Sequence, residues 1–218
     1  MDTNQVLSLL SNHQNERGIA NFEKLKMGQL RSYGIGLTML KKMAKEIGRN
    51  HELALALWEL PVYEALQLSA LIDEPKKISR EQVNNQVSKL NFWMLSYVFC
   101  STLWGKLSFS QTLTDEWVNS TNDIERRCAY LILYQFAQTN KVLPDAYFLS
   151  HLDRIEKDLQ KEENFVRDAM NSALLSIGKR NAILRQRTIV AATNIGKVIV
   201  DYGDNSCQAP DALKHFNK

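Results

Sequence analysis

The sequence predicts an all-α fold, a right-handed curved solenoid of stacked helical repeats. Only nine glycines and four prolines occur in 218 residues, and they fall between segments whose apolar residues recur at helical spacing. Arg127 and Arg167 each stand two residues before an alanine, and they lie 40 positions apart. That offset falls in the range of roughly 40–47 residues that is typical of HEAT-type repeats. Helical hairpins stacked in this way present a long surface to a ligand.

Apolar periodicity and helix-end signals define the elements of the first part of the chain. Gly48 fits the stop of one helix, Asn50 can cap the next, and Pro61 can open the one after that. Glu52 suits the positive end of the second of these helices. The predicted helices cover residues 3–10, 37–47, 51–60 and 61–71, and a polar segment, 12–34, ends in a turn.

In the rest of the chain, Ser79 has the spacing of a capping box and starts a helix toward Leu90. Residues 91–103 are too apolar and aromatic for a surface helix, which predicts a buried central helix. Thr114 is expected to cap a short helix that runs through Trp117. Further helices are predicted over residues 123–138, 145–158, 164–177 and 181–195.

The tail has a different character from the helices before it. Residues 196–203 are β-prone, and residues 210–216 can form a last helical turn. We therefore expect a single domain, with an N-terminal extension over 1–32, a repeat core over 33–195 and an irregular tail over 196–218.

Composition limits the partners. The net charge of +3 and the pI near 8.7 are too mild to indicate a nucleic-acid partner unless the cations lie on one face. Three widely spaced cysteines argue against disulfides and zinc, and no apolar run reaches the roughly 18 residues of a membrane span. The N-terminus lacks the order of a signal peptide. We expect a cytoplasmic protein with no cofactor, no metal and no membrane contact.

Two groups of cations are candidates for phosphate contacts. Arg127 and Arg167 should lie on one face, one repeat apart, either to bind phosphates or to bridge repeats through acids such as Asp168 or Asp123. Lys179 and Arg180 end a helix and are followed on the next helix by Arg185 and Arg187. This second group could follow a phosphate backbone, although a helix C-terminus favours cations without any ligand. Weaker candidates, which a solvated face explains equally well, are Lys41, Lys42 and Lys45.

Trp93 and Tyr97 are the aromatic candidates. They stand four residues apart, share a helix face, and could line a cleft that stacks on bases, with core packing as the alternative. The four histidines are scattered. No arrangement of a nucleophile with a base and no glycine-rich phosphate loop occurs in the sequence, so it assigns no catalytic residue.

Several blocks resemble a known family. They are Tyr33-Gly34-Ile-Gly-Leu37, Lys45-Glu-Ile-Gly48, His51-Glu-Leu-Ala-Leu-Ala-Leu-Trp58, Asp168-Ala-Met-Asn-Ser-Ala-Leu174 and Ile177-Gly-Lys-Arg-Asn181. In this order they are similar to the bacterial DNA alkylation repair family, the HEAT-like-repeat alkylpurine DNA glycosylases of the AlkC/AlkD superfamily. The resemblance covers about residues 33–195. It implies an all-α solenoid whose concave face binds duplex DNA through its backbone, and lesion excision without conventional base flipping.

The resemblance also implies a lost catalytic centre. Active members carry a Trp-Asp-x-x-Asp motif whose last aspartate assists cleavage, and here Trp93 is followed by Met94 and Tyr97 at the acidic positions. No Asp or Glu occurs between Glu81 and Asp115, so no small shift of the alignment restores the acid. A family tryptophan is replaced by Ser172, whereas the DNA-contacting arginine corresponds to Arg127.

We therefore expect a DNA-binding HEAT-like-repeat protein that contacts duplex DNA, damaged or structured, on a concave basic face. The expected DNA-contacting residues are Trp93, Tyr97, Arg127, Arg167, Lys179, Arg180 and Arg187. One alternative is an active alkylpurine glycosylase that uses other residues, such as Tyr97 or Glu64. The other alternative is a protein-interaction scaffold, a common role of helical solenoids.

Overall fold

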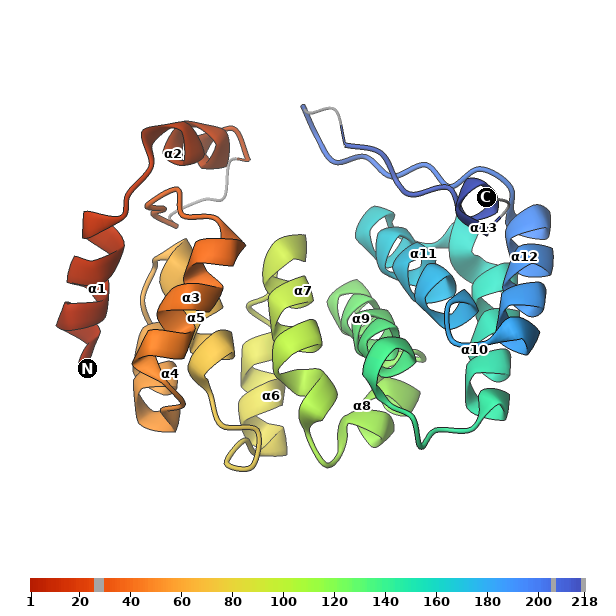
Figure 1. The fold of residues 1–218 in the computed structure, drawn as a ribbon, viewed down its shortest axis with the longest axis horizontal. Helices are drawn as coiled ribbons and strands as arrows, with labels where there is room; N and C mark the ends of the chain where they lie inside the picture. The colour runs from red at the N-terminus through yellow and green to blue at the C-terminus, as the bar shows by residue number, and fades with distance from the viewer. Residues whose placement is uncertain (26–29, 205–206, 217–218) are drawn as a thin grey trace. The chain divides into compact units, whose positions relative to one another are not determined.

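The computed structural model describes residues 1–25, 30–204 and 207–216 as helices joined by irregular segments (Figure 1). The remaining positions, 26–29, 205–206 and 217–218, belong to the predicted polar segment and tail and lie outside the described residues. Within the described ranges β-pairing is limited to one isolated bridge between Arg31 and Val62. The predicted all-α class is therefore confirmed. None of the described helices is long and apolar enough to cross a bilayer.

The chain divides into two compact units. Unit 1 comprises Met1–Gln86 and Thr102–Leu107, and unit 2 comprises Val87–Ser101 and Ser108–Lys218. The single domain expected from the sequence stays a prediction.

The helices of unit 1 follow the predicted pattern, with one addition. Asn50 accepts a hydrogen bond from the backbone N–H of Leu53, and Gly48 ends a helix at a φ of 78°. The sequence predicted these two helix ends correctly, because capping interactions involve only three or four neighbouring residues. The helices are α1 (Thr3–Asn12), α2 (Glu16–Glu23), α3 (Leu37–Ile47), α4 (His51–Trp58), α5 (Tyr63–Ile72), most of α6 (Arg80–Val87) and the 3₁₀ turn η1 (Trp104–Lys106).

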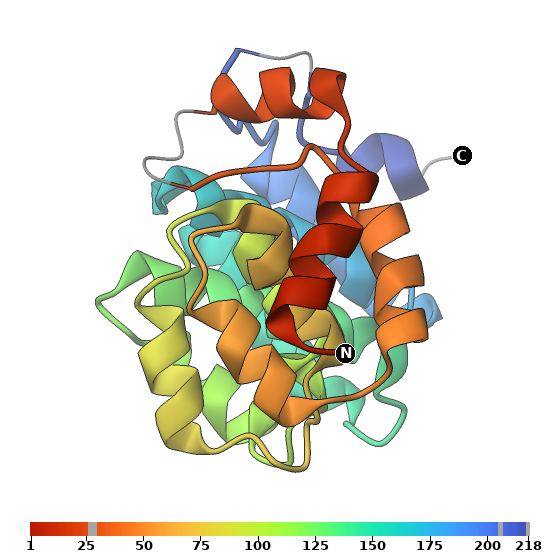
Figure 2. The same ribbon diagram turned by 90° about the vertical axis from the view of Figure 1, so that its left-hand side faces the viewer.

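The sequence did not predict α2, which Figure 2 shows on the near side of unit 1 together with α1. Asn15 caps α2 by accepting from the N–H of Gly18 at 2.8 Å. The ring of Phe22 packs 4.8 Å from that of Tyr63. A short polar helix anchored through one aromatic contact carries too little apolar periodicity to be recognised.

A buried carboxylate organises the turn that precedes α3. Glu64 is fully buried on α5, and it accepts hydrogen bonds from Ser32 Oγ at 2.7 Å, from Tyr33 N at 3.0 Å and from Ile35 N at 3.1 Å. A buried charge of this kind is tolerated because its oxygens are satisfied by donors.

Unit 2 is built from α7 (Trp93–Thr102, whose last residue belongs to unit 1), α8 (Ser110–Trp117), α9 (Asp123–Thr139), α10 (Asp145–Asp158), the 3₁₀ turn η2 (Leu159–Lys161), α11 (Asn164–Gly178), α12 (Ala182–Ile195) and α13 (Ala212–Phe216). Helix α9 packs against α8 and α11, while α12 packs against α10, α11 and α13. Helices α9 and α12 therefore each pack against a sequence neighbour and against the helix two places away, as in stacked helical hairpins.

Two predictions for unit 2 were wrong. Thr114 lies inside α8, where its hydroxyl donates to the Ser110 carbonyl at 2.9 Å, and the helix begins at Ser110. The β-prone tail forms no strand within its described residues, because its polar backbone groups pair with α11 instead. The side chain of Asn164 accepts from the N–H of Asp201 and donates to its carbonyl.

The last helical turn was predicted correctly and forms α13. Its docking depends on Gly178, because a Cβ at this position would lie 2.6 Å from a ring atom of Phe216. The C-terminal segment therefore returns to the end of α11.

His151 makes the stability of unit 2 dependent on pH. It is 7% exposed on α10, and burial lowers its pKa to about 4, with a smaller raising effect from Asp115 and a smaller lowering effect from Arg154. The unfolded chain, with a histidine pKa near 6.5, takes up a proton between pH 6.5 and 4 that the folded chain does not. Protonation of His151 therefore does not reduce the free energy of unfolding above pH 6.5, and it reduces this free energy progressively as the pH falls below 6.5.

We predict that this group alone lowers the free energy of unfolding by about 2 kcal/mol between pH 7 and pH 5. Urea unfolding at both pH values, compared between the native chain and His151→Gln, measures the effect. The variant should lose much of the pH dependence, and an unchanged dependence would show that His151 does not cause it.

Candidate nucleic-acid interface

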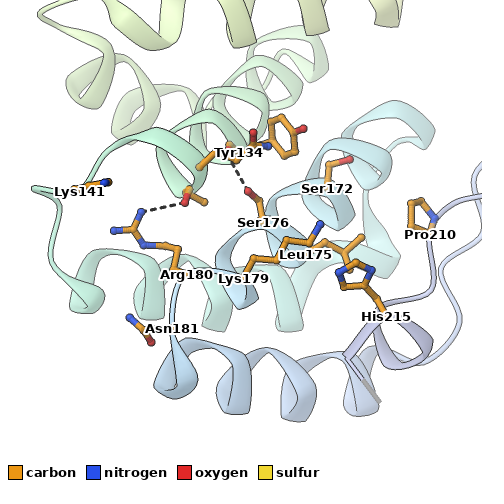
Figure 3. Close-up of a pocket in the computed structure, with 12 residues that line it drawn as sticks. Tyr134, Lys141, Ser172, Leu175, Ser176, Lys179, Arg180, Asn181, Pro210 and His215 are labelled. Atoms are coloured by element: carbon orange, nitrogen blue, oxygen red, sulfur yellow. Dashed lines mark hydrogen bonds between the residues drawn. The ribbon is translucent and has the colours of Figure 1, made fainter. Parts of the chain in front are cut away.

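A groove with a volume of about 1020 Å³ lies in unit 2, between α9, α11 and the returning tail (Figure 3). Helix α11 is fixed to α9 beside it, because Ser176 Oγ donates to the Tyr134 carbonyl at 3.2 Å. The groove is lined by Tyr134, Ala137, Gln138 and Lys141 from α9 and the turn after it, by Ser172, Leu175, Ser176, Lys179, Arg180 and Asn181 from α11 and its end, and by Pro210 and His215 from the tail.

The lining of this groove is cationic. Lys141, Lys179 and Arg180 line it together with His215, and its lining contains no Asp or Glu. Lys141 and Lys179 are exposed, and within the described part of the chain no side-chain hydrogen bond or ion pair engages either ammonium group. A pocket that gathers cations without carboxylates attracts anions, and phosphates above all.

Arg180 is held firmly in the wall of the groove. One guanidinium nitrogen donates to the carbonyls of Phe136 at 3.2 Å, Ala137 at 3.1 Å and Asn140 at 2.8 Å. Its guanidinium carbon lies 4.1 Å from the centre of the Phe148 ring. Arg180 thus closes the C-terminal end of α9, where carbonyls are left without partners, and its charge faces the groove from a fixed position.

The two candidate aromatics lie at different places. The ring of Tyr97 is half-buried, 6.2 Å from that of Tyr134, which lines the groove. Trp93 stacks on Phe165 at 6.0 Å and meets the edge of Tyr202 at 6.1 Å, so the tail covers part of its surface. Tyr97 therefore adjoins the groove, whereas Trp93 belongs to an aromatic cluster with the tail.

Arg127 is 4% exposed inside unit 2. Its guanidinium donates to the Leu90 carbonyl and to Ser96 Oγ at 2.8 Å, which joins α9 to the start of α7. A DNA contact by Arg127 would require the side chain to leave both acceptors.

Arg167 also binds backbone carbonyls, those of Ile199 and Glu162, each at 2.9 Å. Neither Arg127 nor Arg167 bridges to Asp168 or Asp123. The neighbouring Arg126 does form an ion pair, in which its guanidinium binds Glu162 at 2.9 Å.

Arg187 lies away from the groove on α12, where it pairs with Asp153 at 2.6 Å and with Glu156 at 2.5 Å on α10. Of the seven candidate residues, the structure places Lys179 and Arg180 in the groove and Tyr97 beside it. The DNA contacts expected of all seven residues stay predictions.

Sequence reasoning missed three residues of the groove: Lys141, Tyr134 and His215. Lys141 follows α9 as Lys179 follows α11, so its place at the end of a repeat helix was a usable signal. Tyr134 and His215 gave none, because they reach the groove through packing between distant segments. Asp168, which the sequence suggested as a partner of an arginine, accepts instead from the Tyr202 hydroxyl at 2.6 Å, and burial raises the pKa of its carboxyl.

The phenol of Tyr97 stays neutral near pH 7. Burial, followed by the nearby Tyr134, raises its pKa above the ordinary value. Tyr97 therefore supplies no negative charge to a cationic reaction centre. The described residues contain no cluster of three or more His, Cys, Asp or Glu that could hold a metal ion.

Comparison with known proteins finds similar chains in two Listeria species. A protein from Listeria innocua named "Uncharacterized protein Lin0241" is 29% identical over 189 residues, which are 85% of this chain and 82% of that protein. "Uncharacterized protein Lmo0209" from Listeria monocytogenes is 30% identical over 195 residues, with the same coverage.

A solved structure matches 100% of this chain and 93% of its own, with a TM-score of 0.87 and 20% sequence identity. It represents "a new family of proteins related to the HEAT-like repeat DNA glycosylases with affinity for branched DNA structures". This likeness confirms the predicted HEAT-like-repeat fold. The family model for the DNA alkylation repair enzyme matches residues 3–215, more than the resemblance in the sequence covered. The chain therefore belongs to the DNA alkylation repair enzyme family.

Proposed function

We propose that this protein binds the phosphate backbone of DNA through the groove of unit 2 and does not excise bases by the aspartate-assisted route of its family. The observation that carries the proposal is the gathering of Lys141, Lys179 and Arg180 in a groove whose lining has no carboxylate. Because no group of the described residues pairs with the two lysine ammonium groups, their binding to phosphates breaks no ion pair. Their binding also releases counterions from the DNA.

The preferred DNA is duplex with a branch or another structural departure. The solved structure with the same fold represents a family with affinity for branched DNA. The groove contacts expected here are to phosphates, which carry no base sequence, so binding should depend on shape and salt and not on sequence. We also propose a cytoplasmic location, since the DNA of a bacterial cell lies there.

Three features support the absence of aspartate-assisted cleavage. Tyr97 replaces the acid and stays protonated near neutral pH. Ser172, on the groove wall, stands where the family has a tryptophan and offers little surface for stacking. Glu64, an alternative acid, is fully buried and its carboxylate accepts three hydrogen bonds.

We predict that Lys141→Gln combined with Lys179→Gln weakens DNA binding by about tenfold at moderate salt. The slope of log affinity against log salt should become shallower by roughly 2, because each lost phosphate contact removes about one released counterion. Fluorescence anisotropy with a labelled duplex at several salt concentrations measures both quantities.

The matched control is Lys157→Gln combined with Lys161→Gln, which removes the same charge from exposed positions on α10 and η2. This control should bind nearly as the native chain does. An equal loss in both double variants would mean that only net charge matters, and no loss in the groove variant would refute the groove as the site.

We predict no release of 3-methyladenine or 7-methylguanine from methylated DNA above the rate without protein, because Tyr97 stands in place of the aspartate and stays neutral near pH 7. Chromatography of the released bases, beside an active alkylpurine glycosylase, measures this. Release by the native chain would favour the alternative of a glycosylase that uses other residues. If the native chain has no affinity for any DNA, the protein-interaction scaffold becomes the better account.

A further inference from the structure

Helix α3 of unit 1 carries a row of lysines that the groove of unit 2 does not use. With about 100° between successive residues, Lys41, Lys42 and Lys45 fall within an arc of about 100°. This arc lies opposite the buried Leu40 and Met43. All three lysines are exposed, and within the described part of unit 1 no side-chain hydrogen bond or ion pair engages them.

Two further cations extend the row beyond α3. Arg49 follows the helix and is exposed, with one guanidinium nitrogen donating to the Asp73 carbonyl. Lys106 comes from η1, far along the chain, and is also exposed. Partial burial and, after it, the nearby charge of Arg49 lower the pKa of the Lys106 ammonium. We call Lys41, Lys42, Lys45, Arg49 and Lys106 the α3 ridge.

The acids near the α3 ridge leave its charge largely uncompensated. The Asp73 carboxylate pairs with His51 at 2.6 Å and accepts from the side-chain amide of Gln82 at 2.9 Å. Glu74 pairs with Lys77 at 2.9 Å. Glu46 lies at the edge of the lysine arc, and its carboxylate makes no ion pair within the described residues.

A row of exposed like charges costs electrostatic free energy unless it meets an anionic partner or is screened by salt. Five cations from three segments of unit 1 make a long array, and the repeated charges of a nucleic-acid backbone fit such an array. The α3 ridge belongs to unit 1 and the groove to unit 2, so each unit carries a cationic surface of its own.

We propose that the α3 ridge is a second phosphate-binding surface that contacts a DNA arm other than the arm bound in the groove. The inference rests on the proposed function, since it assumes that DNA occupies the groove. A branched molecule offers several duplex arms, so the cationic surface of each unit can bind an arm of its own.

The test uses the triple variant Lys41→Gln, Lys45→Gln and Lys106→Gln of the full chain. Its affinity is measured for a four-way DNA junction and for a short duplex identical to one arm of that junction. The affinity for the junction should fall by about tenfold, with a salt slope shallower by roughly 2–3, while the affinity for the duplex stays within about twofold of native.

A matched triple variant, Lys76→Gln, Lys157→Gln and Lys161→Gln, removes the same charge at other exposed positions and should bind both DNAs nearly as the native chain does. Far-ultraviolet circular dichroism through thermal unfolding verifies that both triple variants fold.

Three outcomes overturn the inference. An equal loss of affinity for the junction and for the duplex means that the ridge contacts the same DNA arm as the groove does. No loss on either DNA means that the ridge contacts no phosphate, even if the groove variant loses affinity and the proposed function stands. A ridge variant that loses binding to phosphatidylserine vesicles but keeps native affinity for the junction assigns the ridge to a membrane surface. If the groove variant keeps native affinity, the proposed function fails independently of the ridge.

Discussion

The structure of unit 2 depends on the buried guanidinium of Arg127. Burying a cation costs free energy that acceptors offset, and here the Leu90 carbonyl and Ser96 Oγ both accept from one guanidinium nitrogen, while the buried Nε has no hydrogen-bond partner among the described residues. Because both acceptors lie at or just before the start of α7, the arginine fixes that helix against α9. The positions of Trp93 and Tyr97 on α7 follow from this joint.

The arginines and the lysines discussed for unit 2 make different contacts. The planar fork of arginine can bind several acceptors at once, and Arg127, Arg167 and Arg180 all use it to bind backbone carbonyls. Lysine has a single flexible ammonium group, and Lys141 and Lys179 keep theirs in solvent. These three arginines thus hold segments of unit 2 together, while the two lysine ammonium groups stay accessible. The sequence does not show this difference, so it placed Arg127 and Arg167 among the expected DNA contacts together with Lys179.

Local signals predicted most of the fold, and non-local packing accounts for what they missed. The caps at Asn50 and Asn181 act within a single turn of helix, so the sequence placed α4 and α12 closely. The groove could be predicted only in part, since Lys179 and Arg180 are neighbours in sequence whereas His215 arrives with the tail. The tail docks because Gly178 leaves room for Phe216, a contact between segments that no periodicity reveals.

The central claim is that phosphates occupy the groove of unit 2, and lysine labelling of the native protein tests it most directly. Acetylation rates of individual lysines are measured by mass spectrometry with and without a saturating four-way junction. DNA should protect Lys141 and Lys179 strongly while Lys157, exposed on α10, reacts at its free rate. Protection of Lys157 equal to that of the groove lysines, or unchanged reactivity of Lys141 and Lys179 in the complex, would contradict the account.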